Sequence, residues 1–96
     1  MMRELDPLLH SQLRLSIVSI LLSVAEADFV YLRQKTGATS GNLSVQIDKL
    51  SEAGYIEVEK ESGGRSSRTT CRLTDKGRTA LEEYIQILKE DYFHLP

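Results

Sequence analysis

The apolar positions of the first quarter of the chain repeat with the period of an α-helix and fall on two faces. Asp6 and Pro7 mark a helix start, because a carboxylate accepts a free N–H group and proline lacks the N–H that would be unpaired there. We expect a helix over about 7–24, with one face more than a surface helix needs. The first face carries Leu13, Ile17, Ile20, Leu21 and Val24, and the second carries Leu8, Leu15, Val18 and Leu22.

Two shorter helices follow, separated by a tight turn. Asp28 is suited to cap the first of them, and Gly37 suits the left-handed residue that ends it. Thr39 or Ser40 caps the second. The single apolar stripe of that second helix consists of Leu43, Ile47 and Leu50. Two short helices across a glycine-containing turn predict a helix-turn-helix over about 28–53.

From Tyr55 onward the period changes to two residues, which is typical of β-strands. Apolar and polar residues alternate at 56–59 and again at 70–73. The segment between them, 61–68, has glycines, serines and two arginines but no apolar residue, which predicts an exposed loop. Together these features predict a β-hairpin over about 55–73.

A last helix, capped by Thr74, is expected over about 75–91. The predicted order is thus α-α-α-β-β-α in one mainly α (α+β) domain over 1–96. The last helix carries apolar residues on neighbouring faces, more than one contact within the chain would cover. Two arrangements could cover the second stripe of the first helix. Either the last helix covers it within the chain, or both terminal helices form a two-fold homodimer interface. We favour the homodimer. The expected interface residues are Leu8, Leu15, Val18, Leu22, Leu81, Tyr84, Ile85 and Leu88.

Charge is distributed unevenly along the chain, although its total is small. The formal net charge is −2, which alone weighs against a nucleic-acid partner. Between residues 63 and 78, however, five basic residues stand against one acid, so this segment carries +4. A basic segment on an exposed hairpin favours contact with the phosphates of a nucleic acid.

The segments GATSGNLSVQIDKLSEAGYIEVEK (37–60) and GGRSSRTTCRLTDKGR (63–78) resemble the MarR and ArsR-like bacterial and archaeal regulators, particularly their short stand-alone members. The most specific pieces are LSEAGYIE, the arginines of the hairpin, and RLTDKGR. The resemblance covers nearly the whole chain. It implies a winged helix-turn-helix that binds double-stranded DNA, at a pseudo-palindromic operator, as a homodimeric transcriptional regulator. The second helix of the motif would enter the major groove, and the hairpin, or wing, would contact the minor groove or the backbone.

The side chains around the apolar stripe of that second helix suit the same partner. Asn42 and Gln46 have amides that can pair with adenine, and Val45 can contact a thymine methyl group. Asp48 near the exposed face would repel phosphates, and many relatives carry a basic residue where this chain has Val45, so affinity should depend on the wing. The expected DNA-binding residues are Thr39, Ser40, Asn42, Ser44, Val45, Gln46, Lys49, Arg65, Ser66, Ser67 and Arg68.

Other kinds of function receive less support. A winged helix used only for protein contacts is the main alternative. We expect no enzymatic activity and no cofactor, because the sequence offers no paired carboxylates, activated nucleophile or phosphate-binding loop. His10 and His94 lack the spacing of metal ligands, and Cys71, the one cysteine, is expected to be a buried core residue. The apolar run over 17–24 is too short to span a bilayer, so a cytoplasmic protein without a membrane partner is expected. The sequence assigns no effector.

Overall fold

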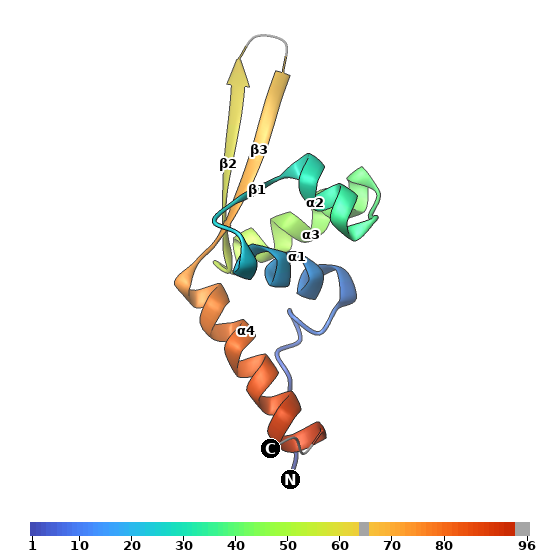
Figure 1. The fold of residues 1–96 in the computed structure, drawn as a ribbon, viewed down its shortest axis with the longest axis vertical. Coiled ribbons are helices and arrows are strands. Elements are labelled where there is room, and N and C mark those ends of the chain that lie inside the picture. The colour runs from blue at the N-terminus through green and yellow to red at the C-terminus, as the bar shows by residue number, and fades with distance from the viewer. Residues whose placement is uncertain (64–65, 94–96) are drawn as a thin grey trace.

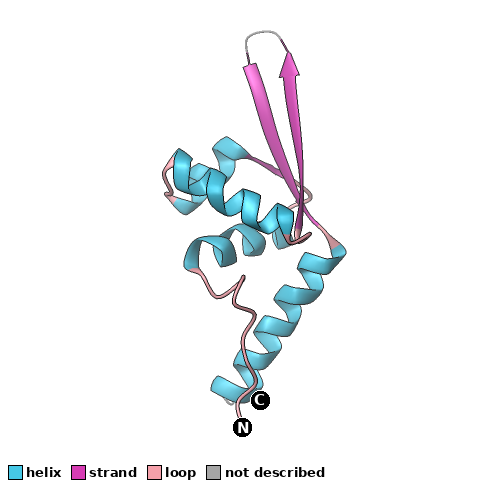
Figure 2. Cartoon of the chain, turned by 180° about the vertical axis from the view of Figure 1, so that it is seen from behind, coloured by secondary structure: helices cyan, strands magenta, loops and turns pink. Residues whose placement is uncertain are grey.

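Three helices pack together beside a projecting β-hairpin, and a fourth helix extends away from them at the opposite end (Figures 1 and 2). The computed structural model describes residues 1–63 and 66–93. Its elements are α1 (Gln12–Ser23), β1 (Ala27–Asp28), α2 (Phe29–Thr36), α3 (Ser40–Glu52), β2 (Ile56–Gly63), β3 (Ser66–Leu73), α4 (Asp75–Ile87) and a final π-helical turn, η1 (Leu88–Tyr92). The predicted winged arrangement is confirmed, with one added strand. Of the helices described, none has the length and apolar character needed to cross a membrane.

The first helix is shorter than the expected 7–24, because the Asp6–Pro7 signal starts a turn and not the helix. The Asp6 side chain accepts from the Leu8 amide at 2.9 Å, and its carbonyl accepts from the His10 amide, also at 2.9 Å. Ser11 is then extended, with φ −152° and ψ 127°, so that α1 begins only at Gln12. A carboxylate followed by proline suits an isolated turn as well as the start of a helix. For that reason the predicted helix began too early.

The core surrounds α1, which lies between the other helices and the sheet. The buried residues of this core are Leu9, Ile17, Val18, Leu21, Ala27, Leu32, Leu43, Ile47, Leu50, Ile56, Cys71, Leu81 and Tyr84. Three expected interface residues, Val18, Leu81 and Tyr84, are therefore part of the core of the single chain, with exposed fractions of 0%, 2% and 5%. They were expected in the dimer interface, but α4 packs against α1 and covers part of its second apolar face within the single chain.

The added strand β1 fastens the start of α2 to the wing. Ala27 pairs with Cys71 and Asp28 with Thr70, giving a sheet of order β1-β3-β2 with antiparallel neighbours. The Asp28 side chain also accepts from the Tyr31 amide at 2.8 Å, which confirms it as the cap of α2. A two-residue strand has no periodicity to read, so the sequence could not reveal it.

The wing, which we define as β2 and β3, is paired for nearly its full length. The register runs from Ile56 opposite Leu73 to Gly63 opposite Ser66. The loop expected over 61–68 is thus mostly strand. A segment without apolar residues can still form a ladder when both of its faces are solvated, because the backbone makes the hydrogen bonds.

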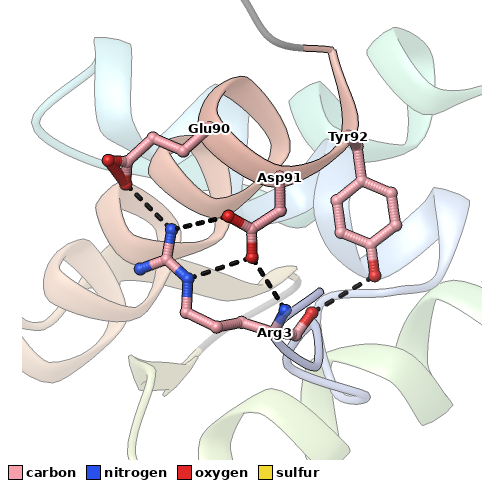
Figure 3. A network of polar contacts seen from close by, with 4 residues as sticks. All are labelled: Arg3, Glu90, Asp91 and Tyr92. Carbon is pink, nitrogen blue, oxygen red and sulfur yellow. Dashed lines mark hydrogen bonds and ion pairs between the residues drawn. The ribbon is translucent and has the colours of Figure 1, made fainter. Parts of the chain in front are cut away.

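The N-terminal segment lies beside η1, which continues α4, and Arg3 binds it there (Figure 3). The Arg3 amide donates to Asp91 at 2.7 Å, and its guanidinium donates to Asp91 at 3.0 Å and to Glu90 at 2.8 Å. The Tyr92 hydroxyl donates to the Arg3 carbonyl at 3.2 Å. Hydrogen bonds from Arg3 lower the pKa of Asp91 below its usual range. The N-terminal segment and η1 therefore meet at the tip opposite the wing.

Candidate nucleic-acid interface

The recognition surface expected on the helix-turn-helix is the outer face of α3. Leu43, Ile47 and Leu50 anchor the helix, with exposed fractions of 0%, 3% and 0%. Thr39 caps it by accepting from the Asn42 amide at 3.2 Å, and Gly37 has the left-handed φ of 72° expected at the turn. The side chains left exposed on the outer face are Thr39, Ser40, Asn42, Ser44, Val45 and Lys49, joined by Asp48.

Gln46 differs from its expected role, because both ends of its amide are already hydrogen-bonded. Its carbonyl oxygen accepts from Arg14 of α1 at 2.6 Å, and its amide nitrogen donates to the Asn42 carbonyl oxygen at 3.0 Å. A two-bond pairing of Gln46 with adenine would therefore have to use the second lone pair of its oxygen and the second hydrogen of its NH₂ group, or break these bonds. Arg14 was not expected in this surface, because its one signal in the sequence is a charge within an apolar helix, which does not reveal its partner.

The outward face of the wing is less basic than its sequence suggests. Arg72 pairs with Glu59 at 2.6 Å and with Glu26 at 3.1 Å, and Arg68 pairs with Asp28 at 3.3 Å. The charge of +4 was counted along one segment, whereas these carboxylates come from other segments that the fold brings alongside. Arg68 remains 64% exposed, so its ion pair is weak and phosphates can compete for it.

The opposite face of the wing carries a cation that the sequence analysis also missed. Side chains alternate along a strand, so Lys60 lies on the same face as Ile56 and Val58, which adjoin the core on the helical side. Lys60 is exposed, and within residues 1–63 and 66–93 it has no ion-pair partner. The alternation was visible in the sequence and could have placed Lys60 there. Beyond it this face continues with the hydroxyl side chains Thr69, Ser62 and Ser67.

The side chains of two expected wing contacts are not described in the structure. Arg65 lies outside the described residues, and Ser66 is described only as the first residue of β3. Ser67 and Arg68 are both exposed.

Near α3, the last turn of α2 adds the exposed cations Arg33 and Lys35, which lie just before the N-terminus of α3 in the chain. A helix N-terminus attracts anions, so cations beside it strengthen the same preference.

Cys71 occupies the core position expected for it. Its side chain is fully buried at 0% exposure, and burial raises the pKa of the thiol to about 11. The His10 ring approaches the Tyr84 hydroxyl at 3.1 Å. Over the described part of the chain, no group of three or more histidine, cysteine or carboxylate side chains is placed to hold a metal ion. The candidate site is therefore a surface, formed by α3 and the wing.

Comparison with known proteins assigns this arrangement to a family. The model of a family described as "winged helix DNA-binding domain" matches residues 13–91. The chain belongs to this family. It is 34% identical over 76 residues to an uncharacterised protein of Methanocaldococcus jannaschii, a match that covers 79% of this chain and 83% of that protein.

Solved structures of winged-helix proteins give the same result. A transcriptional regulator homologue from Pyrococcus horikoshii OT3 superposes with a TM-score of 0.82 at 28% identity, covering 92% of this chain and 87% of that one. A MarR-family transcriptional regulator from Silicibacter pomeroyi has a TM-score of 0.68 at 22% identity, and the matched region spans 58% of its length. The predicted resemblance to the MarR-like group is thus confirmed in the fold.

Proposed function

We propose that this winged-helix protein is a transcriptional regulator that binds double-stranded DNA sequence-specifically as a homodimer. The observation that carries the proposal is the outer face of α3, where a well-anchored helix presents Asn42, Ser44 and Val45 to solvent. An α-helix fits the major groove, and these side chain types can contact base edges there. Membership of a DNA-binding family and the likeness to a protein called a transcriptional regulator homologue support the same reading.

The remaining exposed groups suit the DNA backbone. Thr39 and Ser40 lie at the N-terminus of α3, where backbone N–H groups and hydroxyls together favour a phosphate. On the wing, Lys60 and Arg68 supply cations for phosphates or a minor groove, and Arg65 is proposed to act with them. Contacts of this type hold a protein in register on the duplex, while base contacts select the sequence.

Salt-dependent binding tests the backbone contacts. We expect affinity for a duplex to fall linearly with salt on logarithmic axes, and Lys60→Ala to lower that slope by about one, because one phosphate contact is lost. Lys89→Ala is the matched control, since Lys89 is an exposed lysine of η1 at the end opposite the wing. Equal slopes for parent, Lys60→Ala and Lys89→Ala would remove this face of the wing from the interface.

The homodimer is proposed from apolar side chains that the single chain covers only in part. Of the expected interface residues, Leu8, Leu15, Leu22 and Leu88 are partly buried and Ile85 is 38% exposed. Tyr92 and Phe93, 38% and 60% exposed, extend this surface at the far end of the chain. A two-fold pairing through α1 and α4 would cover these groups and carry two copies of α3, as a two-fold operator requires.

Sedimentation of paired variants tests that interface. Leu22→Asp should give monomers, because a carboxylate in a dry interface loses its hydration without a partner, whereas Ser19→Asp, on the same helix at an exposed position, should remain dimeric. Ile85→Asp repeats the test at a more exposed site where the fold tolerates the charge. Dimers in all three variants would place the interface elsewhere.

The alternative function is a module for protein contacts without DNA binding. It is favoured by the exposed apolar residues Val30 and Tyr31 on α2, 61% and 38% exposed, beside a hollow of about 370 Å³ that Val30 and Arg33 help to line. A chain that shows no salt-dependent retention on any duplex, with its fold intact, would favour this alternative over the proposal.

A further inference from the structure

A chain of three hydrogen bonds joins the turn before α1 to the outer face of α3. Arg14 of α1 donates from Nε to the Leu8 carbonyl at 2.6 Å and from Nη1 to the Gln46 carbonyl oxygen at 2.6 Å. Gln46 then donates from Nε2 to Oδ1 of Asn42 at 3.0 Å. The last two residues are four apart on α3, the spacing at which helical side chains meet. The chain therefore ends on a residue that we place against DNA bases.

The direction of this chain follows from the chemistry of its first member. A guanidinium group only donates hydrogen bonds, so the amide of Gln46 must turn its oxygen toward Arg14. The remaining end of that amide is an NH₂ group, which only donates, so Asn42 must offer its oxygen in return. The NH₂ group of Asn42 is thereby directed away from Gln46. No other assignment of the two amides allows all the bonds.

Arg14 is well placed to hold this orientation. Its side chain is partly buried, and both of its bonds carry the positive charge, which makes them stronger than bonds between neutral groups. The Leu8 carbonyl belongs to the turn before α1, so Arg14 is fixed on one side by a segment outside the recognition surface. Gln46 is in turn partly buried, whereas Asn42 is exposed.

We propose that Arg14 is a positioning residue that determines which base edge Asn42 reads. This inference rests on the proposed DNA-binding function. The two-bond pairing of asparagine with adenine uses its carbonyl as well as its NH₂ group, and here the carbonyl already accepts from Gln46, which leaves one lone pair of that oxygen for a base. The NH₂ group, turned away from Gln46, matches an edge made of acceptors. Guanine presents two acceptors, N7 and O6, in the major groove, so Asn42 should select guanine over adenine.

The test compares the affinities of duplexes that carry guanine or adenine at the base pair that Asn42 contacts. That base pair is identified as the one at which Asn42→Ala no longer discriminates between bases. Gln46→Met breaks the chain while leaving Arg14 bound to Leu8, and Arg14→Met breaks it from the other end. Arg14→Lys restores a donor, and Arg78→Met is the control for loss of an exposed arginine, on α4. Circular dichroism checks each fold, and Gln46→Met suffices if Arg14→Met does not fold.

We expect the parent to prefer guanine, and Gln46→Met and Arg14→Met to shift the ratio about tenfold toward adenine, since one good base contact discriminates by about that factor. Arg14→Lys should lie closer to the parent, and Arg78→Met should match it. An unchanged guanine-to-adenine ratio in Gln46→Met overturns this inference and leaves the proposed function standing. An Asn42→Ala variant that keeps every base preference does the same. A parent that binds no duplex instead removes the proposed function and the inference with it.

A second readout needs no DNA. In the amide region of the ¹⁵N–¹H spectrum of the free protein, the Gln46 side chain NH₂ should exchange with water more slowly than that of Asn42, and Arg14→Met should abolish the difference. Equal exchange of the two groups in the parent would contradict the orientation on which the inference depends.

Discussion

Replacing Gly77 by alanine should destabilise the protein, although alanine is the better helix former. Gly77 is the third residue of α4, where its amide donates to the Thr74 cap at 3.0 Å. A Cβ atom built there would lie far inside van der Waals contact with the Tyr55 carbonyl oxygen and 2.8 Å from Cδ1 of Leu73. The Tyr55 carbonyl also accepts from the Thr74 amide at 3.0 Å, so moving it away would weaken that bond.

The sizes of the opposing effects decide whether Gly77→Ala raises or lowers the free energy of unfolding. Alanine gains about 1 kcal/mol over glycine within a helix. Forcing a methyl group into a packed contact costs about 1–3 kcal/mol, and a weakened backbone hydrogen bond adds about 1 kcal/mol. We therefore expect Gly77→Ala to lower the free energy of unfolding by about 1–3 kcal/mol. For a small domain this shifts the urea midpoint by about 1 M.

Urea denaturation at one protein concentration measures the effect, because a dimer's stability depends on concentration. Gly41→Ala is the matched control: Gly41 is also in a helix, and a Cβ there would meet nothing within 4 Å. It should raise the free energy of unfolding by about 0.5–1 kcal/mol. The reasoning is refuted if Gly77→Ala is as stable as the parent or more so, since the close approach of α4 to Tyr55 would then be absent.

Three further results are expected. Leu43→Ala should lower the free energy of unfolding by about 2–5 kcal/mol in thermal or urea unfolding by opening a cavity beneath α3, and a loss below 1 kcal/mol would contradict the packing. Because burial raises the pKa of the Cys71 thiol to about 11, folded protein at pH 8 should resist thiol reagents that react once it is unfolded. Burial and then the hydrogen bond to Asp6 raise the pKa of Tyr55 to about 12. The contribution of Tyr55 to the free energy of unfolding should be complete below the unfolded pKa of about 10 and lost as the pH rises through 12. An absorbance titration should show the Tyr55 phenol ionising late.

The starts of α2, α3 and α4 were predictable because each of these helices carries its own capping residue, whereas α1 lacks a side-chain cap. Asp28, Thr39 and Thr74 cap α2, α3 and α4 as expected, and the α3 stripe is buried as its spacing indicated. Such signals act within one turn of a helix, so they are legible without knowledge of the fold. The alternation in β2 and β3 likewise identified the wing.

What the sequence could not supply depends on contacts between distant segments. The pairing of β1 with β3, the extended residue Ser11 and the bond between Arg14 and Gln46 leave no periodic trace. The spacing outlined the apolar faces of α1 and α4, although Leu8 lies in the turn before α1 and not on that helix. Which part of each face is covered within the chain depends on where the two helices cross. For that reason Val18 was expected in the interface and lies in the core.

Selection of bound sites from a random duplex pool tests directly whether the protein binds DNA sequence-specifically as a dimer. We expect enrichment of an inverted repeat whose half-sites lie about one helical turn apart, because two copies of α3 related by a two-fold axis enter successive major grooves. Asn42→Ala should relax the preference at one symmetric pair of positions while Lys89→Ala leaves the selected sequence unchanged. A pool that shows no enrichment over its input, from protein that is folded and intact, would contradict the account.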